Sequence, residues 1–243
     1  MEPVYIEPVE SERKYQRLAE LGTRLKVPVT EAFLTLRVMD RHSRVIHHTK
    51  QRSHSWTRNA YQMLATGIGG MRNSGTFADG SLATRNTAGS VISNVYLANT
   101  GGVSSNFNVD SEAVGKAYRG PNGDNVSGIV VGTGDPPESF DNYALAVALA
   151  EGTGAGQVNY MAGEPVVKSW DAGTRILSVE HKRYINNNSP GTITIREIGL
   201  IASGSQGTSL RALMSRDVLG SPVDVPASGQ ILAIYTISLV YPD

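Results

Sequence analysis

Hydrophobic and polar residues alternate through the last third of the chain with the two-residue period of a pleated β-strand. The clearest cases are residues 192–201 (TITIREIGLI) and 231–241 (ILAIYTISLVY), where β-branched and aromatic side chains recur at every second position. The turn-forming sequence NNNSPG at 186–191 predicts a hairpin between strands at 175–185 and 192–202. Short strands at this spacing are typical of an antiparallel β-sandwich. Further β structure is expected at 128–134, 158–161 and 212–219, with a helical or extended piece at 142–149.

The first 30 residues have a helical pattern. Residues 11–21 predict a short helix with Ser11 as its N-cap and Gly22 as its end. Its large apolar residues are Tyr15, Leu18 and Leu21, which form a narrow face. We therefore expect this N-terminal arm to dock on another surface or to fray.

A hairpin and a helix are expected next. Residues 33–39 and 44–48 alternate as two strands around a polar turn. Residues 56–66 then contain good helix formers, with Ser55 as the expected N-cap and Gly67 as the expected end.

The region from 71 to 127 is rich in Gly, Ser, Asn and Thr, and only residues 91–97 have a strand pattern within it. Loops of this length are usually disordered or held by a partner, and we expect neighbouring copies to hold them. The sequence therefore predicts a mainly β chain in four parts: an N-terminal arm (1–30), a β-hairpin plus helix subdomain (31–70), a loop region (71–127) and a C-terminal antiparallel β-sandwich (128–243).

Composition removes several classes of protein. The 243 residues include no Cys, so disulfides and thiolate metal sites are excluded, and the net charge is zero. The longest apolar runs, 143–150 and 231–240, are shorter than the roughly 20 residues that a membrane helix needs. The first residues lack the basic start and apolar stretch of a secretory signal, so we expect a protein made in the cytoplasm of its host.

Two glycine clusters and several carboxylates are the candidates for chemistry. The clusters at 132–135 and 152–156 lack the Lys that follows the glycines of a phosphate-binding loop, so turns are the favoured interpretation. The acidic residues are scattered, and we assign no catalytic residue and no cofactor. The candidate carboxylates are Asp135, Glu138, Asp141, Glu180 and Glu197.

Histidines are concentrated near the expected hairpin. Because His47 and His48 are adjacent on a strand, they point to opposite faces, so at most one of them joins His42 or His54 around a metal ion. We assign no metal; a solvated hairpin or a subunit contact is the competing interpretation. The fifth histidine, His181, has no recognisable catalytic partner and is read as a strand residue.

The segment from Arg41 to Arg72 is the one strong charge asymmetry. It has no acidic residue, and Trp56 and Tyr61 lie within it, which suits contact with a nucleic-acid backbone. The favoured alternative is that these cations face acidic surface on a neighbouring subunit, such as the region 7–12. The cations are Arg41, Arg44, Lys50, Arg52, Arg58 and Arg72.

Three segments carry a family resemblance: residues 193–200 (ITIREIGL), 213–218 (LMSRDV) and 234–240 (IYTISLV). They resemble the attachment domains of tail-collar and tail-fibre proteins, which are structural proteins of tailed bacteriophages. The resemblance implies a multi-copy virion component built on a β-sandwich, with copies of itself and other virion proteins as partners. The tail, its tip or its neck is the expected location.

Other functions stay open. Capsid decoration or cementing is the close alternative to a tail location. A host-surface glycan-binding module would present exposed aromatic residues such as Tyr118, Tyr160 or Trp170, and an enzyme would degrade cell-wall polymers.

Overall fold

The computed structural model describes residues 2–6, 9–69, 84–92, 96–97, 106–107, 113–204 and 210–242. β-strands dominate these residues and form a large sheet, a three-stranded sheet and two small strand pairs. The mainly β fold expected from the alternating pattern is confirmed.

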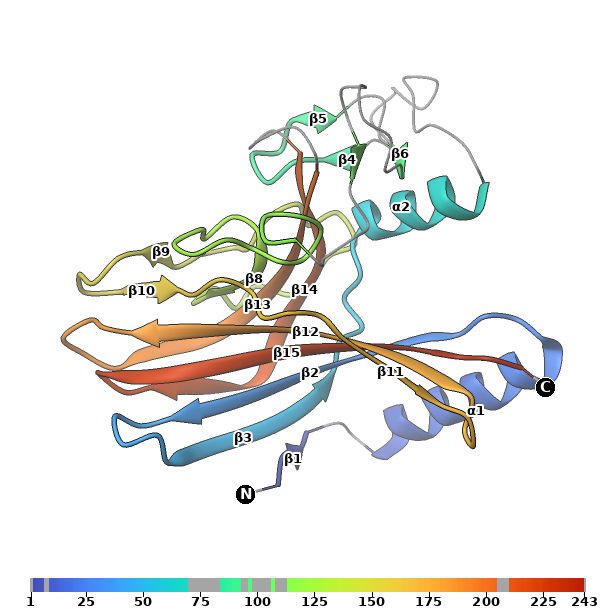
Figure 1. The fold of residues 1–243 in the computed structure, drawn as a ribbon, viewed down its shortest axis with the longest axis horizontal. Coiled ribbons are helices and arrows are strands. Elements are labelled where there is room, and N and C mark those ends of the chain that lie inside the picture. The colour runs from blue at the N-terminus through green and yellow to red at the C-terminus, as the bar shows by residue number, and fades with distance from the viewer. Residues whose placement is uncertain are drawn as a thin grey trace.

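The larger sheet joins the two ends of the chain (Figure 1). It contains β1 (Val4–Tyr5), β2 (Thr30–Met39), β3 (Val45–Arg52), β9 (Ala150–Glu151), β10 (Gln157–Tyr160), β11 (Val167–Asp171), β12 (Ile176–Asn187) and β15 (Gly229–Val240). The strand order is β1-β3-β2-β15-β12-β10-β9, and β11 pairs with the first half of β12. β2 lies antiparallel to β15 from Thr30 opposite Leu239 to Met39 opposite Gln230. The predicted hairpin of β2 and β3 therefore shares one sheet with the last strand of the chain.

The smaller sheet stacks on one face of the larger sheet. It contains β8 (Gly128–Gly132), β13 (Ile193–Ser203) and β14 (Arg211–Val225), in the order β14-β13-β8. Side chains from both sheets form one hydrophobic core, with Leu36 and Tyr235 from the larger sheet and Ile198 and Leu200 from the smaller. Burial of these alternating side chains is the main stabilising contribution to the fold.

The hairpin expected between residues 175–185 and 192–202 is wrong. β12 pairs with β15, β10 and β11, whereas β13 pairs with β14 and β8. The connection crosses from one sheet to the other, and Asn187 Nδ2 fixes it by donating to the carbonyls of Gly191 and Val225, each at 2.8 Å.

The first helix is longer than expected. Helix α1 spans Val9–Leu25, so it passes through Gly22 and ends before Lys26, which has a φ of 57°. Gly22 is needed for another reason: a Cβ there would collide with the side chain of Val29, which folds back against the helix.

The second helix begins and ends later than expected. Helix α2 spans Arg58–Gly69 and continues past Gly67. Neither Ser55 nor Trp56 belongs to it: Trp56 forms a β-bridge with Ser215 of β14 and packs against the core. Thr57 precedes the helix and its hydroxyl donates to the carbonyl of Leu213 at 2.6 Å.

The rest of the chain consists of short strands and loops. The expected strand at 91–97 lies partly outside the described residues, and its described ends form the short strands β5 (Val91–Ile92) and β6 (Tyr96–Leu97). Much of the predicted loop region also lies outside the described residues. Residues 142–149 are not helical, but Leu145 and Leu149 are buried in the core. The remaining short strands are β4 (Thr84–Arg85), which pairs with β5, and β7 (Asn106–Phe107), which pairs with β6.

Candidate assembly surface

The Glu-Ile-Gly-Leu segment of β13 lies in the interior. The side chain of Glu197 is fully buried and that of Arg216 is 1% exposed. Arg216 Nε donates to Glu197 Oε2 at 2.6 Å, and the Glu197 carboxylate also accepts the backbone N–H groups of Gly134, Ala146 and Val147. This residue therefore ties the loop after β8 to the smaller sheet.

The two glycine clusters serve the backbone in different ways. Gly132 and Gly134 have no positive φ; instead, a Cβ at either position would lie 2.6 Å from Glu197 Oε1. They are required by the close approach of the loop to the carboxylate, which differs from the expected turn role. Gly152 and Gly156 do have positive φ, of 145° and 74°, as the turn interpretation predicts.

A second buried cation holds the loops at the end of the core. Arg183 of β12 is 1% exposed, and its guanidinium donates to five backbone carbonyls. Burial lowers the pKa of Arg183 to about 10. The accepting carbonyls are those of Pro121, Asp124, Ser127, Ile129 and Met161, at 2.7 to 2.9 Å.

Asp217 forms a third buried polar group between the sheets. Its Oδ2 accepts hydrogen bonds from Tyr235 at 2.7 Å, Ser53 at 2.9 Å and Ser215 at 3.0 Å. Burial raises the pKa of Asp217 to about 6, although the three hydroxyl donors act in the opposite direction.

The carboxylates considered for catalysis are engaged on separate elements and do not converge. Glu138 accepts the backbone N–H of Val218 at 2.7 Å and lies 3.7 Å from His54 Nε2. The others pair as follows: Asp135 with Arg196 at 3.5 Å, Asp141 with Arg58 at 2.6 Å, Glu180 with Lys182 at 2.7 Å, and Glu197 with Arg216 at 2.6 Å.

The histidines are likewise dispersed. His47 and His48 occupy consecutive positions of β3, and His42 lies in the turn before it. His181 packs its ring edge-to-face on Tyr118, with centroids 5.0 Å apart, and burial lowers its pKa to about 4. Within the described residues, no three His, Asp or Glu side chains are grouped as a metal site requires.

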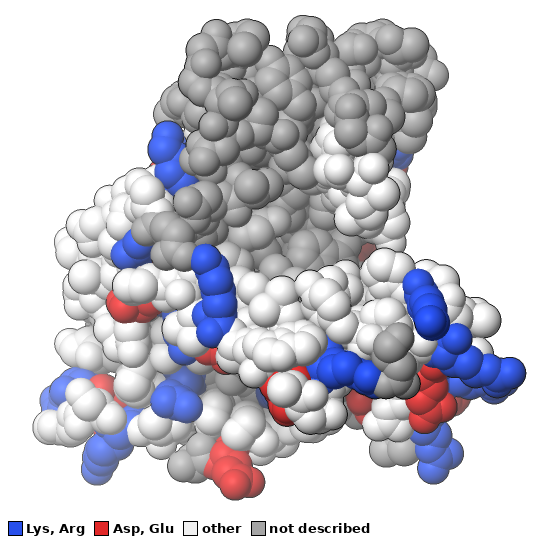
Figure 2. Space-filling model, turned by 45° about the vertical axis from the view of Figure 1, so that its right-hand side comes forward, with Lys and Arg blue, Asp and Glu red and all other residues white. Residues whose placement is uncertain are grey.

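Three of the six cations of the basic segment are paired with carboxylates of their own chain. Figure 2 shows positive and negative side chains mixed over one face of the molecule. Arg52 pairs with Glu12 and Glu31, Arg44 with Asp40, and Arg58 with Asp141. The expectation that the region 7–12 would meet these cations on a neighbouring subunit is wrong for Arg52, whose partner Glu12 is intramolecular. Lys50 lies 4.3 Å from the ring centroid of Phe33, and Arg72 lies outside the described residues.

The arm is anchored to the body through the first half of α1. Arg52 donates to both carboxylate oxygens of Glu12, at 2.8 and 2.9 Å, and stacks over the ring of Tyr15 at 4.2 Å. Tyr5 also donates to Glu12, at 2.6 Å. These contacts hold the pKa of Glu12 near 2, chiefly through the hydrogen bonds from Arg52.

The second half of α1 exposes an apolar stripe. Leu18, Leu21 and Leu25 follow the three- and four-residue spacing of one helical face, and their exposed fractions are 51%, 42% and 65%. A cavity of about 140 Å³ separates Tyr15 and Leu18 from the start of β2. We call Leu18, Leu21 and Leu25 the leucine stripe.

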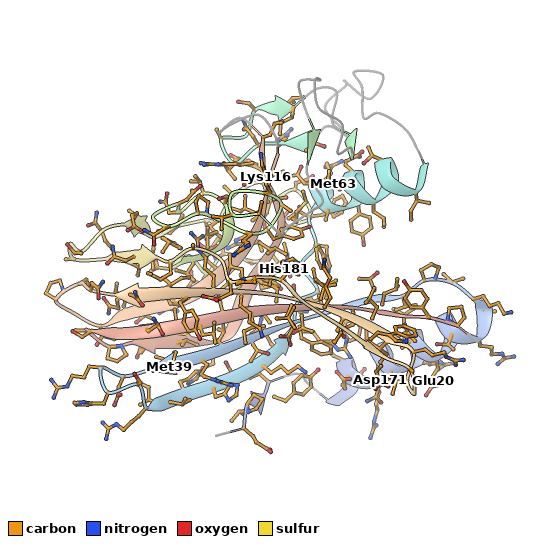
Figure 3. The ribbon with its side chains drawn as sticks, viewed as in Figure 1. Glu20, Met39, Met63, Lys116, Asp171 and His181 are labelled. Carbon is orange, nitrogen blue, oxygen red and sulfur yellow. The ribbon has the colours of Figure 1, made fainter. Side chains whose placement is uncertain are left out.

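The larger sheet extends beyond the smaller sheet at the same end of the molecule. This extension contains β11, the start of β12, the start of β2 and the end of β15 (Figure 1). Asp171 of β11 and Glu20 of α1 lie at this end, whereas Met39 lies at the opposite end of β2 (Figure 3).

The face of the extension that continues the core is apolar. Val179 pairs with Ile237 two residues from the paired His181 and Tyr235, and Leu177 pairs with Leu239 four residues away. All four therefore share the face of the buried Tyr235. The opposite face carries Ser178, Ser238 and Glu180. We call the apolar side the apolar floor; it consists of Trp170, Leu177, Val179, Ile237, Leu239 and Tyr241.

Two aromatic residues of this floor are open to solvent. Trp170 is opposite Leu177 in the β11–β12 pair and meets Tyr241 edge-to-face, with centroids 5.2 Å apart. Their exposed fractions are 52% and 43%.

Tyr160, by contrast, is 1% exposed, so the expectation that it lines a surface groove is wrong. Tyr118 is partly buried and packs against the core, so Trp170 is the one of the three proposed aromatic residues that lies open.

Comparison with known proteins finds no matching family model, no matching curated protein and no matching solved structure. Among the described residues, neither helix is both long and apolar enough to cross a bilayer.

Sequence reasoning missed the apolar floor because it missed β11. The segment Val167–Asp171 is short and mixed in polarity, so its alternation is weak. The following residues Ala172, Gly173 and Thr174 were the available signal, since Asp171 Oδ1 accepts the N–H groups of Gly173 and Thr174 in a tight turn.

Proposed function

We propose that this chain is a non-enzymatic structural protein of a tailed-bacteriophage particle, assembled in multiple copies on the tail side, in the tail, its tip or its neck. The observation that carries the proposal is the set of exposed apolar side chains at one end of the molecule: the leucine stripe of α1, and Trp170 and Tyr241 beside the partly buried aliphatic residues of the apolar floor. Contiguous exposed apolar surfaces of this kind are typical of interaction sites.

The resemblance of residues 193–200, 213–218 and 234–240 to tail-attachment domains adds support of a different kind. In this structure those segments are β13, β14 and β15, and the glutamate of the first segment holds a loop in place through Arg216. The glutamate therefore stabilises the smaller sheet, which packs on the larger sheet that carries the apolar floor.

Capsid decoration is an alternative location for the same kind of assembly, and the labelling experiment described below separates the two locations.

A host-surface glycan-binding module is a second candidate function. It is favoured by the exposed Trp170–Tyr241 pair, because aromatic rings on a sheet surface stack on the apolar faces of sugars. Binding on a glycan array that is lost in Trp170→Ala would support it.

Gold-labelled antibodies raised against the purified chain test the proposal on particles from the host that carries this gene. Label on the tail, tip or neck is the expected result. Label on the capsid would support the decoration alternative, and label on no part of the particle would contradict both.

A further inference from the structure

We propose that the N-terminal arm, which carries β1 and α1, exchanges between two copies of the chain. Each arm then docks on the other copy, in the place that the copy's own arm occupies in this structure. The inference rests on the proposed multi-copy assembly and specifies one contact that builds it. The occupant of the receiving surface is an arm of the same sequence, whose contacts with that surface are seen here within one chain.

The arm is attached to the outside of the body. None of the described residues before Thr30 belongs to either hydrophobic core cluster. Helix α2 packs along β14, whereas α1 has no comparable contact with any described strand and lies outside the stack of the two sheets (Figure 1). The arm can therefore leave its own body without opening the core.

The contacts that hold the arm can be made equally well by an arm from another copy. β1 pairs in parallel with β3, with Val4 opposite Thr49. Arg52 at the end of β3, whose side chain is 5% exposed, donates to both carboxylate oxygens of Glu12. One partner in each contact lies on the arm and the other lies on β3, so exchange keeps these contacts and replaces only their covalent connection.

The segment between α1 and β2 has the properties of a hinge. Lys26, Val27 and Pro28 are exposed, and only residues 26–29 separate the helix from the strand. Lys26 has a φ of 57°, in the left-handed region that is costly for a residue with a Cβ. The closed position of the arm requires this conformation, because it reverses the chain at the end of α1. Opening of the hinge releases the strain, and short strained hinges favour exchange between copies.

The exposed apolar residues of the arm are concentrated beside this hinge. Glu12 and Tyr15, which contact Arg52, lie in the first half of α1. The leucine stripe lies in the second half, and Val27, which is 55% exposed, follows it. In a reciprocal exchange the two hinges cross near the two-fold axis, so residues next to one hinge meet their counterparts from the other copy. Exchange therefore buries the leucine stripe against its own equivalent, whereas the closed position leaves it in solvent.

Disulfide formation between the arm and β3 tests the exchange directly, because the chain contains no Cys. Val4 and Thr49 are paired across β1 and β3, at a separation that a disulfide spans. One chain carries Val4→Cys and a second, differently tagged chain carries Thr49→Cys; they are co-expressed, purified and oxidised at high concentration. The control pairs Val4→Cys with Ile46→Cys, an exposed site on β3 about 10 Å along the strand from Thr49.

The expected result is a covalent heterodimer that is at least several-fold more abundant in the test pair than in the control pair. Lys26→Gly in both chains lowers its yield several-fold, because glycine adopts the left-handed φ without strain and so stabilises the closed position. Leu21→Glu in both chains also lowers the yield, whereas Leu64→Glu, at an exposed site on α2, leaves it unchanged. Circular dichroism shows whether each variant is folded.

Equal yields in the test and control pairs, or no disulfide in either, would overturn the inference. A single chain that carries both Val4→Cys and Thr49→Cys supplies a second readout. An interchain share of disulfide that grows with protein concentration supports exchange, and an intrachain disulfide alone at every concentration would overturn it.

Failure of the proposed function is separable from failure of the exchange. A specific heterodimer with no label on particles contradicts the virion role alone. Labelled particles without the heterodimer contradict the arm exchange alone.

Discussion

Replacement of Glu197 by alanine is the most informative single perturbation of the scaffold. The change leaves the guanidinium of Arg216, which is 1% exposed, without its carboxylate partner. An uncompensated buried charge of this kind costs about 3–5 kcal/mol. The N–H groups of Gly134, Ala146 and Val147 lose their acceptor as well, at about 1–3 kcal/mol for each donor that water does not reach.

We therefore expect Glu197→Ala to lower the free energy of unfolding by at least about 4 kcal/mol, a large part of the roughly 5–15 kcal/mol typical of a folded domain. Urea unfolding followed by tryptophan fluorescence measures the change, since Trp56 packs against the core. Glu180→Ala is the matched control, because Glu180 forms a partly exposed pair with Lys182. That control is expected to change stability by less than about 1 kcal/mol.

A second variant tests the cause of the loss. Glu197→Met combined with Arg216→Met removes both charges, so it is expected to be more stable than Glu197→Ala by at least about 1 kcal/mol. A loss below about 1 kcal/mol in Glu197→Ala, or equal losses in Glu197→Ala and Glu180→Ala, would refute the reasoning from buried charge.

Three further predictions concern single buried groups. Burial raises the pKa of Asp217 from 3.8 to about 6, so the stability of the wild type relative to Asp217→Asn is expected to fall by up to about 3 kcal/mol as the pH rises through this range. A difference independent of pH in urea unfolding would contradict this. Burial lowers the pKa of His181 from 6.5 to about 4, so its contribution is present above pH 6.5 and is lost by up to about 3 kcal/mol as the pH falls towards 4. His181→Gln should lack that loss; an unchanged acid profile would count against the assignment. Arg183→Lys leaves at least two of the five carbonyls without their donor and should cost at least about 2 kcal/mol, with faster amide exchange at 122–129. Lys182→Met is its control, and equal effects would contradict the role of the guanidinium.

The alternation of side chains was sufficient to predict where most long strands lie. β2, β12, β13 and β15 occur within a few residues of their predicted ranges, because their β-branched residues are buried on one face. Strand pairing was not predictable in the same way. The sequence NNNSPG at 186–191 forms a tight connection, but the side chain of Asn187 ties it to Val225, a contact that depends on residues far along the chain.

The predicted C-terminal ends of both helices were wrong for a related reason. Gly22 and Gly67 are local signals for termination, yet α1 and α2 both continue past them. Gly22 is required because the side chain of Val29 packs where a Cβ would lie. This tertiary contact explains the glycine, and the local preference of glycine for helix ends does not.

The candidate surfaces were predictable only in part. The narrow apolar face of the arm is visible in the sequence as Leu18 and Leu21, and its need for a partner follows from helix energetics. The apolar floor is not visible, because Leu177 and Leu239 have the pattern of ordinary core residues. Their partial exposure depends on where the smaller sheet ends, which is a property of the folded chain as a whole.

The molar mass of the purified chain in solution tests the central claim most directly. Light scattering across a range of concentrations is expected to show a discrete species at an integer multiple of 26.0 kDa, which dissociates on dilution and is absent in Leu21→Glu. A constant mass of 26.0 kDa at every concentration would contradict assembly through these surfaces.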